Sequence, residues 1–525
     1  MPCPSKVHGL HVCTFREMPH LCFFAGNQIG TFARGHGVVM NSGYLVVATA
    51  GAVGIGVASD LHEFILTPGG ETALITIYRP TQFEINKDGV LGFVWVMESI
   101  FQEVNISSGE LLFEWRSLDH VHPSQSYLPL NSSNDGISPS EPWDYFHINS
   151  VEKNDVGDYL ISGRHTHCIY KISGENGSIL WQLQGKTSSF LASGFTFAWQ
   201  HDARWLQDNS STTVVSLFDN GRSQDVVNAS SSSGKIISIN HEDATASLIA
   251  QFESTFAPTG LISSISQGNL QNLGNGNVFI GWGAEPFISE HLPNGTAVWS
   301  ATWEDESPNY RAFKADWNGC PNHTFPAVWS YARTNSSRTA IYVSWNGATT
   351  VHSWALYAVG LLDTPATRVA TQIEKTGFET LIWLDHYSPW IMVEALDING
   401  KGLKNSSIFQ TIVPSSRIEA SCGDLHCLGA VVKGPQKLTQ ERWGYDTLGF
   451  LLISSIMTLV VVLFLTCQVC KRFKQYLSSR YLCLRAGKWW RSYYQPIEGV
   501  YTKSTSKVSF ISISTSYKQN PPPTN

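Results

Sequence analysis

Residues 143–185 read WDYFHINSVEKNDVGDYLISGRHTHCIYKISGENGSILWQLQG. Short apolar runs such as Tyr159–Ile161 and Cys168–Ile172 alternate with polar residues, and turn dipeptides such as Asn176-Gly177 separate them. This alternation is typical of three or four short antiparallel strands, for which a propeller blade is the natural candidate. Four polar residues that are unusual for a blade core lie at or near the expected strand ends: His147, Asn149, Arg164 and His165. The segment therefore predicts both a scaffold and a site.

The same design recurs later in the chain. In the first segment Gly157–Ser162 is followed by Asn176–Trp181, and in the second Gly276–Gly281 is followed by Asn294–Trp299. Two weaker echoes of the closing strand end at Trp115 and Trp383. Each Trp is expected to cap one blade against the next, because a four-stranded sheet must bury both faces. We therefore expect an all-β β-propeller with blades of roughly 40–60 residues. An ordinary β-sandwich with coincidental Asn-Gly turns is the alternative.

Composition agrees with a β protein. The chain of 525 residues has 18 Trp and 43 Gly but only 15% charged residues, which argues against a helical bundle and against a disordered chain. The net charge of −7 disfavours a nucleic-acid partner. We find neither a phosphate-binding loop with a Gly-Lys-Ser/Thr ending nor a Gly-x-Ser-x-Gly nucleophile elbow. Nucleotide-dependent transfer and serine hydrolysis therefore lack their main sequence signals.

The hydrophobicity and charge of the sequence change near the C-terminus. Residues 447–467 contain no charge and are long enough to cross a bilayer as a helix. The tail from residue 468 has ten Lys and Arg against one acid, Glu498, so it carries +9 and the remainder carries −16. By the positive-inside rule this predicts a single-pass type I membrane protein. We expect a luminal or extracellular propeller over 1–440, a transmembrane helix over 447–467 and a basic, partly disordered cytosolic tail over 468–525. A buried helix in a soluble protein is the alternative.

Sequons and cysteines fit an exported domain. Nine Asn-x-Ser/Thr sequons precede the apolar segment and none follows it, which predicts a glycoprotein. They start at Asn105, Asn131, Asn176, Asn209, Asn228, Asn294, Asn322, Asn335 and Asn405. Cys13 and Cys22 flank a short loop, as do Cys422 and Cys427, and an oxidising compartment would let each pair close.

The N-terminus lacks the continuous apolar stretch of an export signal. Leu21–Phe24 and Thr31–Val39 already have the pattern of mid-blade sequence. We therefore expect that a signal peptide and about the first blade precede this start. The alternative is that the C-terminal span acts as its own late signal.

Four short motifs occur in a fixed order along the expected blades. They are His147-Ile148-Asn149-Ser150, Ser162-Gly163-Arg164-His165, Gln200-His201-Asp202-Ala203-Arg204 and Ser266-Gln267-Gly268-Asn269. In this combination, over roughly Cys13 to Trp383, the chain resembles the arylsulfotransferase (ASST) family and, more closely, its membrane-anchored eukaryotic branch. The resemblance implies a propeller of about six blades. It also implies sulfuryl transfer from a phenolic sulfate to a phenolic acceptor through a sulfohistidine, without a nucleotide sulfate donor, a cofactor or a metal.

Sulfuryl transfer resembles phosphoryl transfer, so catalysis depends mainly on positioning and electrostatics. It needs an imidazole nucleophile, cationic or N–H donors around the sulfuryl oxygens, and a proton donor for the leaving phenolate. The resemblance places the nucleophile at His201. We expect His147 and Asn149 to stabilise the oxyanion, since they lie on one side of a strand, and Arg164 to be the fixed cation. His62 is the candidate for the leaving-group proton, and His36 is its competitor.

Other interpretations stay open. A strand histidine is more often a hydrogen-bonded structural group than a catalyst. Asp202 and Arg204 can simply form an ion pair at the channel rim. His165 and His167 bracket one residue but lack a third metal ligand at a diagnostic spacing. The rival function is a non-catalytic, membrane-anchored propeller that binds a small ligand or a protein partner. A quinone-cofactor dehydrogenase is a third candidate, but its blade-docking repeats and calcium-ligand carboxylates are not found.

Overall fold

The computed structural model describes residues 6–87, 90–130, 136–254, 260–303, 307–359 and 367–414. Nearly all regular structure in these residues is β-strand, which confirms the expected all-β class. The helical elements described are one turn of helix, α1 (Ser117–His120), and a 3-10 turn at Pro123–Gln125. No helix among the described residues is long and apolar enough to cross a membrane. The segment 447–467, the tail and the pair Cys422/Cys427 lie outside the described residues.

The first 21 strands form five antiparallel sheets in chain order. The first sheet has β1 (Lys6–Phe15), β2 (Met18–Ile29), β3 (Phe32–Met40) and β4 (Val46–Ala50). The second has β5 (Phe64–Leu66), β6 (Thr72–Lys87), β7 (Val90–Asn105) and β8 (Leu111–Arg116). The third has β9 (Ile148–Lys153), β10 (Tyr159–Gly163), β11 (Cys168–Ile172) and β12 (Ile179–Gln184).

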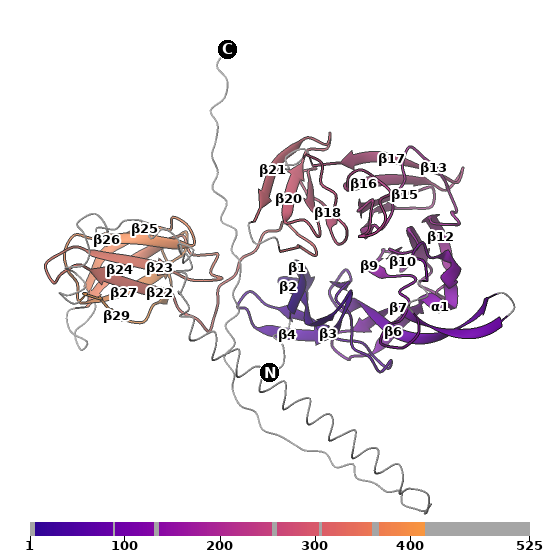
Figure 1. Ribbon diagram of the computed structural model, residues 1–525. Coiled ribbons are helices and arrows are strands. Elements are labelled where there is room, and N and C mark those ends of the chain that lie inside the picture. Colours follow the sequence, from indigo (N-terminus) through magenta and orange to yellow (C-terminus); the bar gives the residue numbers. More distant parts are fainter. Residues whose placement is uncertain are drawn as a thin grey trace, which may run out of the picture.

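The fourth sheet has β14 (His201–Asp208), β15 (Thr212–Asp219), β16 (Ser233–Asn240) and β17 (Thr245–Phe252), and the short β13 (Leu191–Ser193) pairs in parallel with β17. The fifth has β18 (Asn269–Asn272), β19 (Val278–Gly281), β20 (Phe287–His291) and β21 (Ala297–Thr302). Figure 1 shows the five sheets following one another around a common axis. We call them the five-sheet unit.

Consecutive sheets share their cores. Along β10, Tyr159 and Ile161 belong to the cluster with the second sheet, whereas Leu160 belongs to the cluster with the fourth. Alternate side chains of one strand thus fill two cores, which explains why all five residues of β10 are buried. After the fifth sheet, Tyr310 packs beside Phe24 of the first sheet and donates a hydrogen bond from its hydroxyl to His62 O (3.2 Å). The segment that follows the fifth sheet therefore packs against the first sheet.

The closing-strand tryptophans behave as predicted in the second sheet. Trp115 of β8 is 1% exposed, and its indole N–H donates to Gly177 O of the third sheet (3.2 Å). It lies between the two sheets and joins them, as the sequence pattern predicts.

We expect Trp115→Ala to lower the free energy of unfolding by about 3–5 kcal/mol, because it empties a buried aromatic site and leaves Gly177 O without this donor. Urea unfolding of both variants measures this. The matched control is Trp383→Ala, since Trp383 is 38% exposed; its loss should stay below about 1.5 kcal/mol. Equal losses for the two tryptophans would contradict the capping role.

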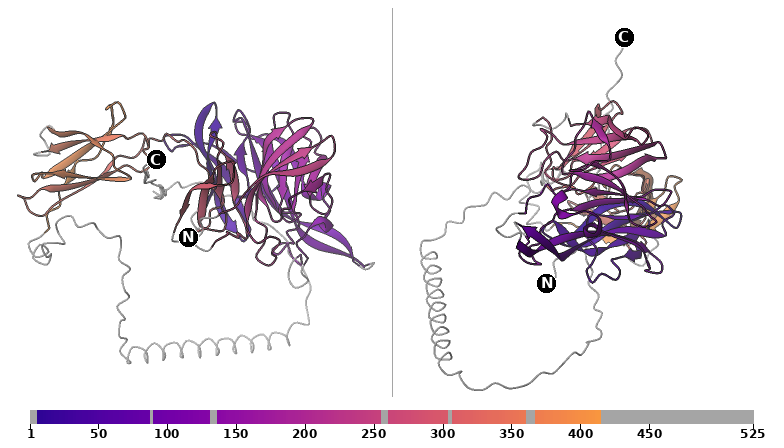
Figure 2. Two further views of the ribbon diagram at one scale, coloured as in Figure 1. Left: turned by 90° about the horizontal axis from the view of Figure 1, so that it is seen from above. Right: turned by 90° about the vertical axis from the view of Figure 1, so that its right-hand side faces the viewer.

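The last eight strands correct the expected organisation. One sheet has β22 (Ala327–Ala332), β23 (Thr339–Ser344) and β26 (Glu379–Leu384). The other has β24 (Ser353–Val359), β25 (Thr367–Glu374), β27 (Trp390–Leu396), β28 (Gly402–Asn405) and β29 (Phe409–Gln410). They bury a core of their own that includes Ile341, Trp354 and Val393. Figures 1 and 2 show this two-sheet unit beside the five-sheet unit.

Two expectations change as a result. The domain expected over 1–440 consists, in its described part, of two units with separate cores. The described residues also hold five sheets around the axis, where about six blades were expected. Trp383 misled the repeat analysis because it lies on β26, whose outward residues alternate with buried ones, so its side chain does not cap a sheet.

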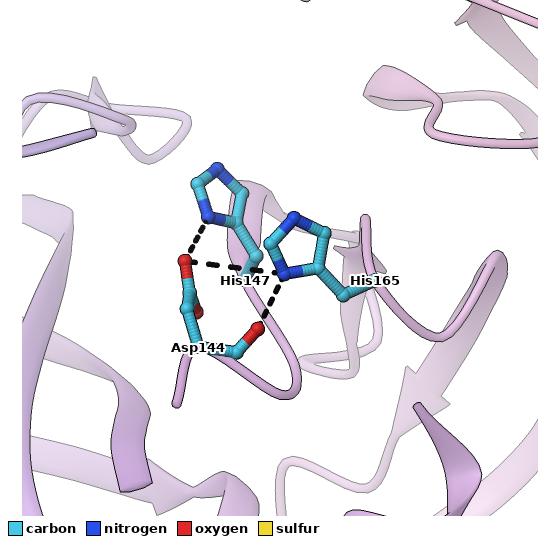
Figure 3. A group of neighbouring side chains, drawn as sticks. All are labelled: Asp144, His147 and His165. Atoms are coloured by element: carbon cyan, nitrogen blue, oxygen red, sulfur yellow. Dashed lines mark hydrogen bonds and ion pairs between the residues drawn. The ribbon is translucent and has the colours of Figure 1, made fainter. Parts of the chain in front are cut away.

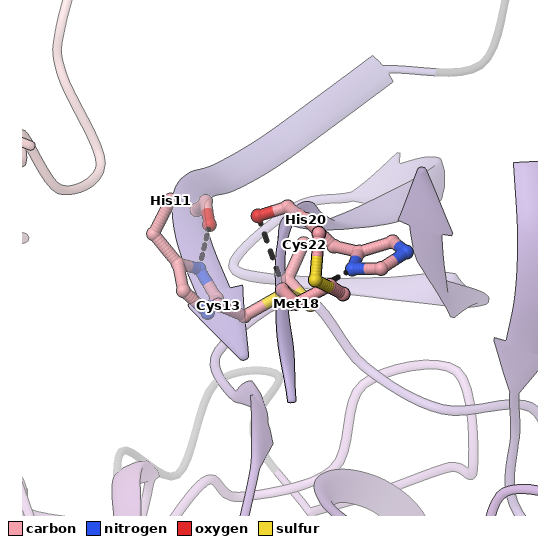
Figure 4. Close-up of a disulfide and its surroundings, with 6 residues drawn as sticks. His11, Cys13, Met18, His20 and Cys22 are labelled. Carbon is pink, nitrogen blue, oxygen red and sulfur yellow. Dashed lines mark hydrogen bonds between the residues drawn. A yellow bond between two sulfur atoms is a disulfide. The ribbon is translucent and has the colours of Figure 1, made fainter. Parts of the chain in front are cut away.

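The predicted pairing of Cys13 with Cys22 is present. The disulfide joins β1 and β2 across the first sheet, with the Cα atoms 5.8 Å apart (Figure 4). Cys168 and Cys320 are free thiols, and Cys168 is buried. The disulfide fits the expectation of an oxidising compartment, which stays a prediction.

Candidate active site

A cavity of about 480 Å³ lies where the five sheets converge. Each sheet contributes a residue from the start of its first strand or just before it: His8, His62, His147, His201 and Gln267. Positions more than 250 residues apart therefore meet, because each sheet begins at the axis. This convergence brings together four of the five predicted site residues: His62, His147, Arg164 and His201.

Backbone strain marks the same positions. His147, Trp199 and Gln267 have positive φ angles of 56°, 58° and 65° although none is glycine. This left-handed conformation costs roughly 1–2 kcal/mol per residue. The chain adopts it on entering three of the five sheets, at residues that line the cavity. The backbone strain is therefore concentrated at residues that line the cavity.

Two histidines are oriented by carboxylates. The ring Nδ1 of His62 bonds to Asp60 Oδ2, and Asp60 is held in turn by the backbone N–H of Ala33 (2.6 Å). The ring Nδ1 of His147 lies 2.5 Å from Asp144 Oδ2. Each carboxylate accepts a hydrogen bond from Nδ1–H, which fixes the orientation of the ring and leaves Nε2 as the second ring nitrogen. The two rings meet edge to face, with centroids 4.7 Å apart.

Asp144 also holds a third ring, as Figure 3 shows. Its backbone carbonyl accepts a hydrogen bond from Nδ1 of His165 at 2.5 Å, and its carboxylate lies 3.9 Å from the same nitrogen. Asp144, His147 and His165 offer ligand atoms within 4.8 Å of one another, so a metal ion is conceivable. Two ligand atoms on one zinc ion would lie roughly 3 Å or more apart. The 2.5 Å contact between Asp144 and His147 is instead a hydrogen bond, and we assign the cluster to proton chemistry.

Arg164 supplies the positive charge. Its guanidinium donates to His165 Nε2 (2.7 Å) and to Ile265 O (3.0 Å), and it lies 5.1 Å from the centre of the Trp199 ring. Its Nε is buried without a partner in the described part of the chain. Burial lowers the pKa of the Arg164 guanidinium to about 10, so the group stays charged at neutral pH. A fixed, incompletely paired cation in a buried position attracts an anion strongly.

His201 is held in one tautomer. Its Nδ1–H donates to Asn220 Oδ1 (2.7 Å), and the amide of Asn220 cannot turn over because its Nδ2 donates to Ser264 O and Gln267 O. The backbone N–H of Gln267 lies 3.2 Å from Nε2 and donates to it. Burial, with Arg164 nearby, holds the pKa of His201 well below its usual value. The ring is therefore neutral, with its lone pair on Nε2.

The other buried rings are neutral as well. Burial holds the pKa values of His147 and His165 well below the ordinary value of 6.5, and Arg164 lowers both further. Each ring nevertheless has Asp144 within reach. An incoming anion would therefore shift His147 toward the imidazolium form, with Asp144 as the counter-charge, whereas Nε2 of His165 already accepts a hydrogen bond from Arg164.

Asn149 differs from its predicted place. It is fully buried, does not line the cavity, and its Nδ2 donates to Gln200 O (2.7 Å). It therefore holds the backbone just before His201 and does not face the cavity as an oxyanion donor. His36, the predicted competitor of His62, is exposed on β3 away from the cavity lining.

A buried charge network adjoins two of the cavity histidines, since Glu63 follows His62 and Asp202 follows His201. Arg204 bonds to Glu63 and to Asp202, both at 2.7 Å, and Arg311 bonds to Glu63 at 2.7 Å. Although burial alone would raise the pKa of Glu63, the two arginines bring it below its ordinary value. The predicted ion pair of Asp202 and Arg204 exists; it is largely buried, and both residues line a further cavity of about 300 Å³. Breaking such a pair leaves an uncompensated buried charge.

Sequence reasoning missed four groups: the carboxylates of Asp60 and Asp144, the amide of Asn220 and the backbone N–H of Gln267. Asp60 lies two residues before His62, and Asp144 lies three residues before His147. An Asp shortly before a candidate His is a usable signal. Asn220 has no such signal, and Gln267 lies in a quoted motif that does not reveal its backbone N–H as a donor, because both reach His201 from distant parts of the chain.

Comparison with known proteins gives one family. The family model described as Arylsulfotransferase (ASST) matches residues 19–304, which is more than half of the chain and includes every residue named for the cavity except His8, Pro308 and Tyr310. No curated protein matches the chain in sequence.

Solved structures give only remote similarities. A protein of unknown function from Bacteroides caccae is 13% identical, with a TM-score of 0.30, over 57% of this chain and 83% of that one. The GH43 protein BlXynB from Bacillus licheniformis is 8% identical, with a TM-score of 0.30, over 75% and 86%. Apo AztD from Citrobacter koseri is 10% identical, with a TM-score of 0.21, over 75% and 95%. These scores are too low for the structures to carry an argument.

Proposed function

The chain belongs to the arylsulfotransferase (ASST) family, and from this premise we propose that it moves a sulfuryl group from an aryl sulfate to a phenolic acceptor through a sulfohistidine at His201. The observation that carries the proposal is the state of His201. Its Nδ1–H donates a hydrogen bond to Asn220 Oδ1, so the lone pair that a nucleophile needs is on Nε2. No nucleotide sulfate donor is required, since the sulfate ester itself supplies the group.

In the first half-reaction, Nε2 of His201 attacks sulfur and the bond from sulfur to the aryl oxygen breaks. The phenolate leaves, taking a proton from the imidazolium form of His62, for which Asp60 is the counter-ion. In the second half, the acceptor phenol gives its proton to Nε2 of His62 while its oxygen attacks sulfur. The bond from sulfur to Nε2 of His201 breaks, and the enzyme returns to its starting state.

The sulfuryl oxygens need donors during both halves. Arg164 supplies a permanent charge. The backbone N–H of Gln267 donates to Nε2 of His201 (3.2 Å) in the free site, and we propose that it passes to an oxygen of the transferred group once Nε2 bonds to sulfur. His147 becomes a donor only as an imidazolium paired with Asp144. We therefore propose that anion binding and protonation of His147 are coupled.

This coupling has a measurable consequence. The pKa of free His147 is lowered by burial, and a bound anion raises it, so binding takes up a proton. Inorganic sulfate should therefore bind more weakly as the pH rises above the lowered pKa of free His147, by up to about tenfold per unit until the raised pKa of the bound form is passed. Calorimetry in buffers of different ionisation enthalpy would register the proton uptake. A sulfate affinity that is constant over this range would contradict the coupling.

For the scaffold, we propose that the five-sheet unit is a five-bladed β-propeller with β1, β5, β9, β14 and β18 innermost. The supporting observations are the shared cores of consecutive sheets and the return of Tyr310 to the first sheet. We also propose that residues 447–467 anchor a glycosylated luminal or extracellular domain. Glycosidase treatment and protease protection of the membrane-bound chain would test that placement.

The activity test uses the full chain with 4-nitrophenyl sulfate and a phenol acceptor. We expect nitrophenol release that depends on the acceptor, with ping-pong kinetics, and a sulfated acceptor as product. Because negative charge develops on the departing phenol oxygen, donors with more acidic phenols should react faster. No release from folded protein across several donors would favour the non-catalytic, ligand-binding propeller instead.

A further inference from the structure

A second cavity lies away from the active site, between the two units. It has a volume of about 610 Å³ and shares no lining residue with the active-site cavity. The five-sheet unit contributes residues of β1, Tyr44 and the connecting segment with Phe313 and Trp317. The two-sheet unit contributes two loops, Trp345–Thr349 and Lys375–Phe378. Small-molecule sites occur preferentially at such junctions between units.

The walls of this junction cavity are held in place by specific bonds between the units. The hydroxyl of Tyr44 donates to Gly347 O (2.7 Å) and accepts from the indole N–H of Trp317 (3.0 Å). The backbone N–H of Cys320 donates to Ser42 O (2.9 Å). Tyr44 also has a positive φ of 61°. The backbone thus adopts a strained conformation to make the contact, and the cavity is formed before any ligand arrives.

The lining is aromatic and carries one cation. Phe313, Trp317, Trp345 and Phe378 provide apolar surface, and Phe378 is 49% exposed. No aspartate or glutamate is among the lining residues. The partner recorded for the Lys375 ammonium is Ala348 O, at a long 3.4 Å, and no carboxylate of the described residues pairs with it. Burial lowers the pKa of Lys375, as expected for a charge without a counter-ion.

From the aromatic walls and the unpaired lysine we propose that the junction cavity binds a small aromatic anion, with the ring among the aromatic side chains and the charged group at Lys375. Aryl sulfonates, sulfates and carboxylates share this chemistry. The site is independent of the proposed transfer reaction and does not require it. A ligand here would contact both units at once, so its binding would also stabilise their junction.

The probe is 2-naphthalenesulfonate, whose sulfur is bonded to carbon and is therefore not transferable. Equilibrium dialysis uses the full chain carrying Arg164→Met and His201→Ala, which disables the active-site cavity. We expect one bound probe per chain in this background. Adding Lys375→Met should weaken binding at least about tenfold, because a charged partner is lost. Lys401→Met, the same change at an exposed position of the same unit, should leave it unchanged.

A cavity-filling variant that is expected to fold normally provides a second test of the junction cavity. Gly377 lines the cavity, and a Cβ atom built there approaches only Glu379 O, at 4.0 Å. Gly377→Leu should therefore fold normally and exclude the probe. The uncharged 2-naphthol should bind at least about tenfold more weakly than the sulfonate in the Arg164→Met/His201→Ala background and be insensitive to Lys375→Met. Comparison with 2-naphthoate tells whether the site selects a sulfonate or accepts any aromatic anion.

Two results would overturn the proposal. One is unchanged probe binding in both Lys375→Met and Gly377→Leu. The other is loss of all binding in the Arg164→Met/His201→Ala background, which would assign the probe to the active-site cavity. The transfer assay on Lys375→Met alone separates the two hypotheses, since its activity should equal that of the unaltered chain whether or not the junction cavity binds the probe.

Discussion

His201→Ala should abolish sulfuryl transfer, lowering kcat/KM by at least about 10³-fold, because the covalent route loses its nucleophile. The neutral ring with its lone pair on Nε2 is prepared by Asn220 and by burial. Stopping the reaction after mixing with 4-nitrophenyl sulfate alone should leave the unaltered chain heavier by about 80 Da, the mass of one sulfuryl group. The variant should show no such adduct, and peptide mapping should place the adduct on His201.

Matched variants make this result specific. His36→Ala makes the same change at an exposed position of β3 and should retain full activity. Asn220→Ala keeps the nucleophile but frees its tautomer, so a smaller loss of about tenfold in kcat is expected, because one hydrogen bond to the ring is removed. Release of nitrophenol that persists in His201→Ala would preserve the activity and discard His201 as the nucleophile. An adduct on His147 in that variant would identify the replacement.

Asp144→Asn should have the second-largest effect, a fall in kcat of about 10²-fold or more with little change in KM. The carboxylate of Asp144 is the counter-charge that allows His147 to become an imidazolium. The backbone carbonyl of Asp144 orients His165 and is kept in the variant. The amide keeps the shape but removes the charge. Because burial raises the pKa of Asp144 above its ordinary value, replacing the carboxyl with a neutral amide should cost little stability.

A structural role alone would not explain the full set of expected readouts. In Asp144→Asn the proton uptake on sulfate binding should shrink and the pH dependence of sulfate affinity should flatten. Asp158→Asn, which removes a carboxylate of the third sheet that lies 3.4 Å from Lys171, should change neither. If Asp144→Asn lowers kcat but leaves the proton uptake intact, the donor to the sulfuryl group is not His147, and Arg164 with the Gln267 N–H must suffice.

Particular residues show how far sequence reasoning reached. The alternation around Tyr159, Leu160 and Ile161 predicted strands, and the structure places these three side chains in two different cores. The spacing of Gly157 to Trp181 and of Gly276 to Trp299 predicted two sheets that exist. Trp383 carries the same local signal but lies on the outward face of β26. Periodicity identifies a strand, whereas the partner of each face depends on chain far away.

The active site shows the same difference between what local sequence predicts and what distant parts of the chain decide. Local motifs carried His147, Arg164 and His201, because each lies at the start of a strand or close to a strand end in a recognisable short motif, whereas His62 lies in none of the four motifs. Asn149 was assigned to the cavity from its spacing to His147, but the chain enters β9 through the positive φ of His147, and the amide turns to Gln200. A rule that assumes a regular strand fails where the backbone leaves the regular conformation.

From the amino-acid order alone follow the all-β class, the strands themselves, the Cys13–Cys22 pair and most of the reactive side chains, because these depend on neighbours along the chain. The tertiary structure alone decides the division into two units, the carboxylates behind His62 and His147, the tautomer of His201 and the junction cavity at Lys375. Each of these depends on groups brought together from distant sheets or on loop geometry with no local signature. The hydrogen bond from Nδ1–H of His201 to Asn220 Oδ1 joins residues 19 positions apart, and such a contact produces no periodic pattern in a sequence.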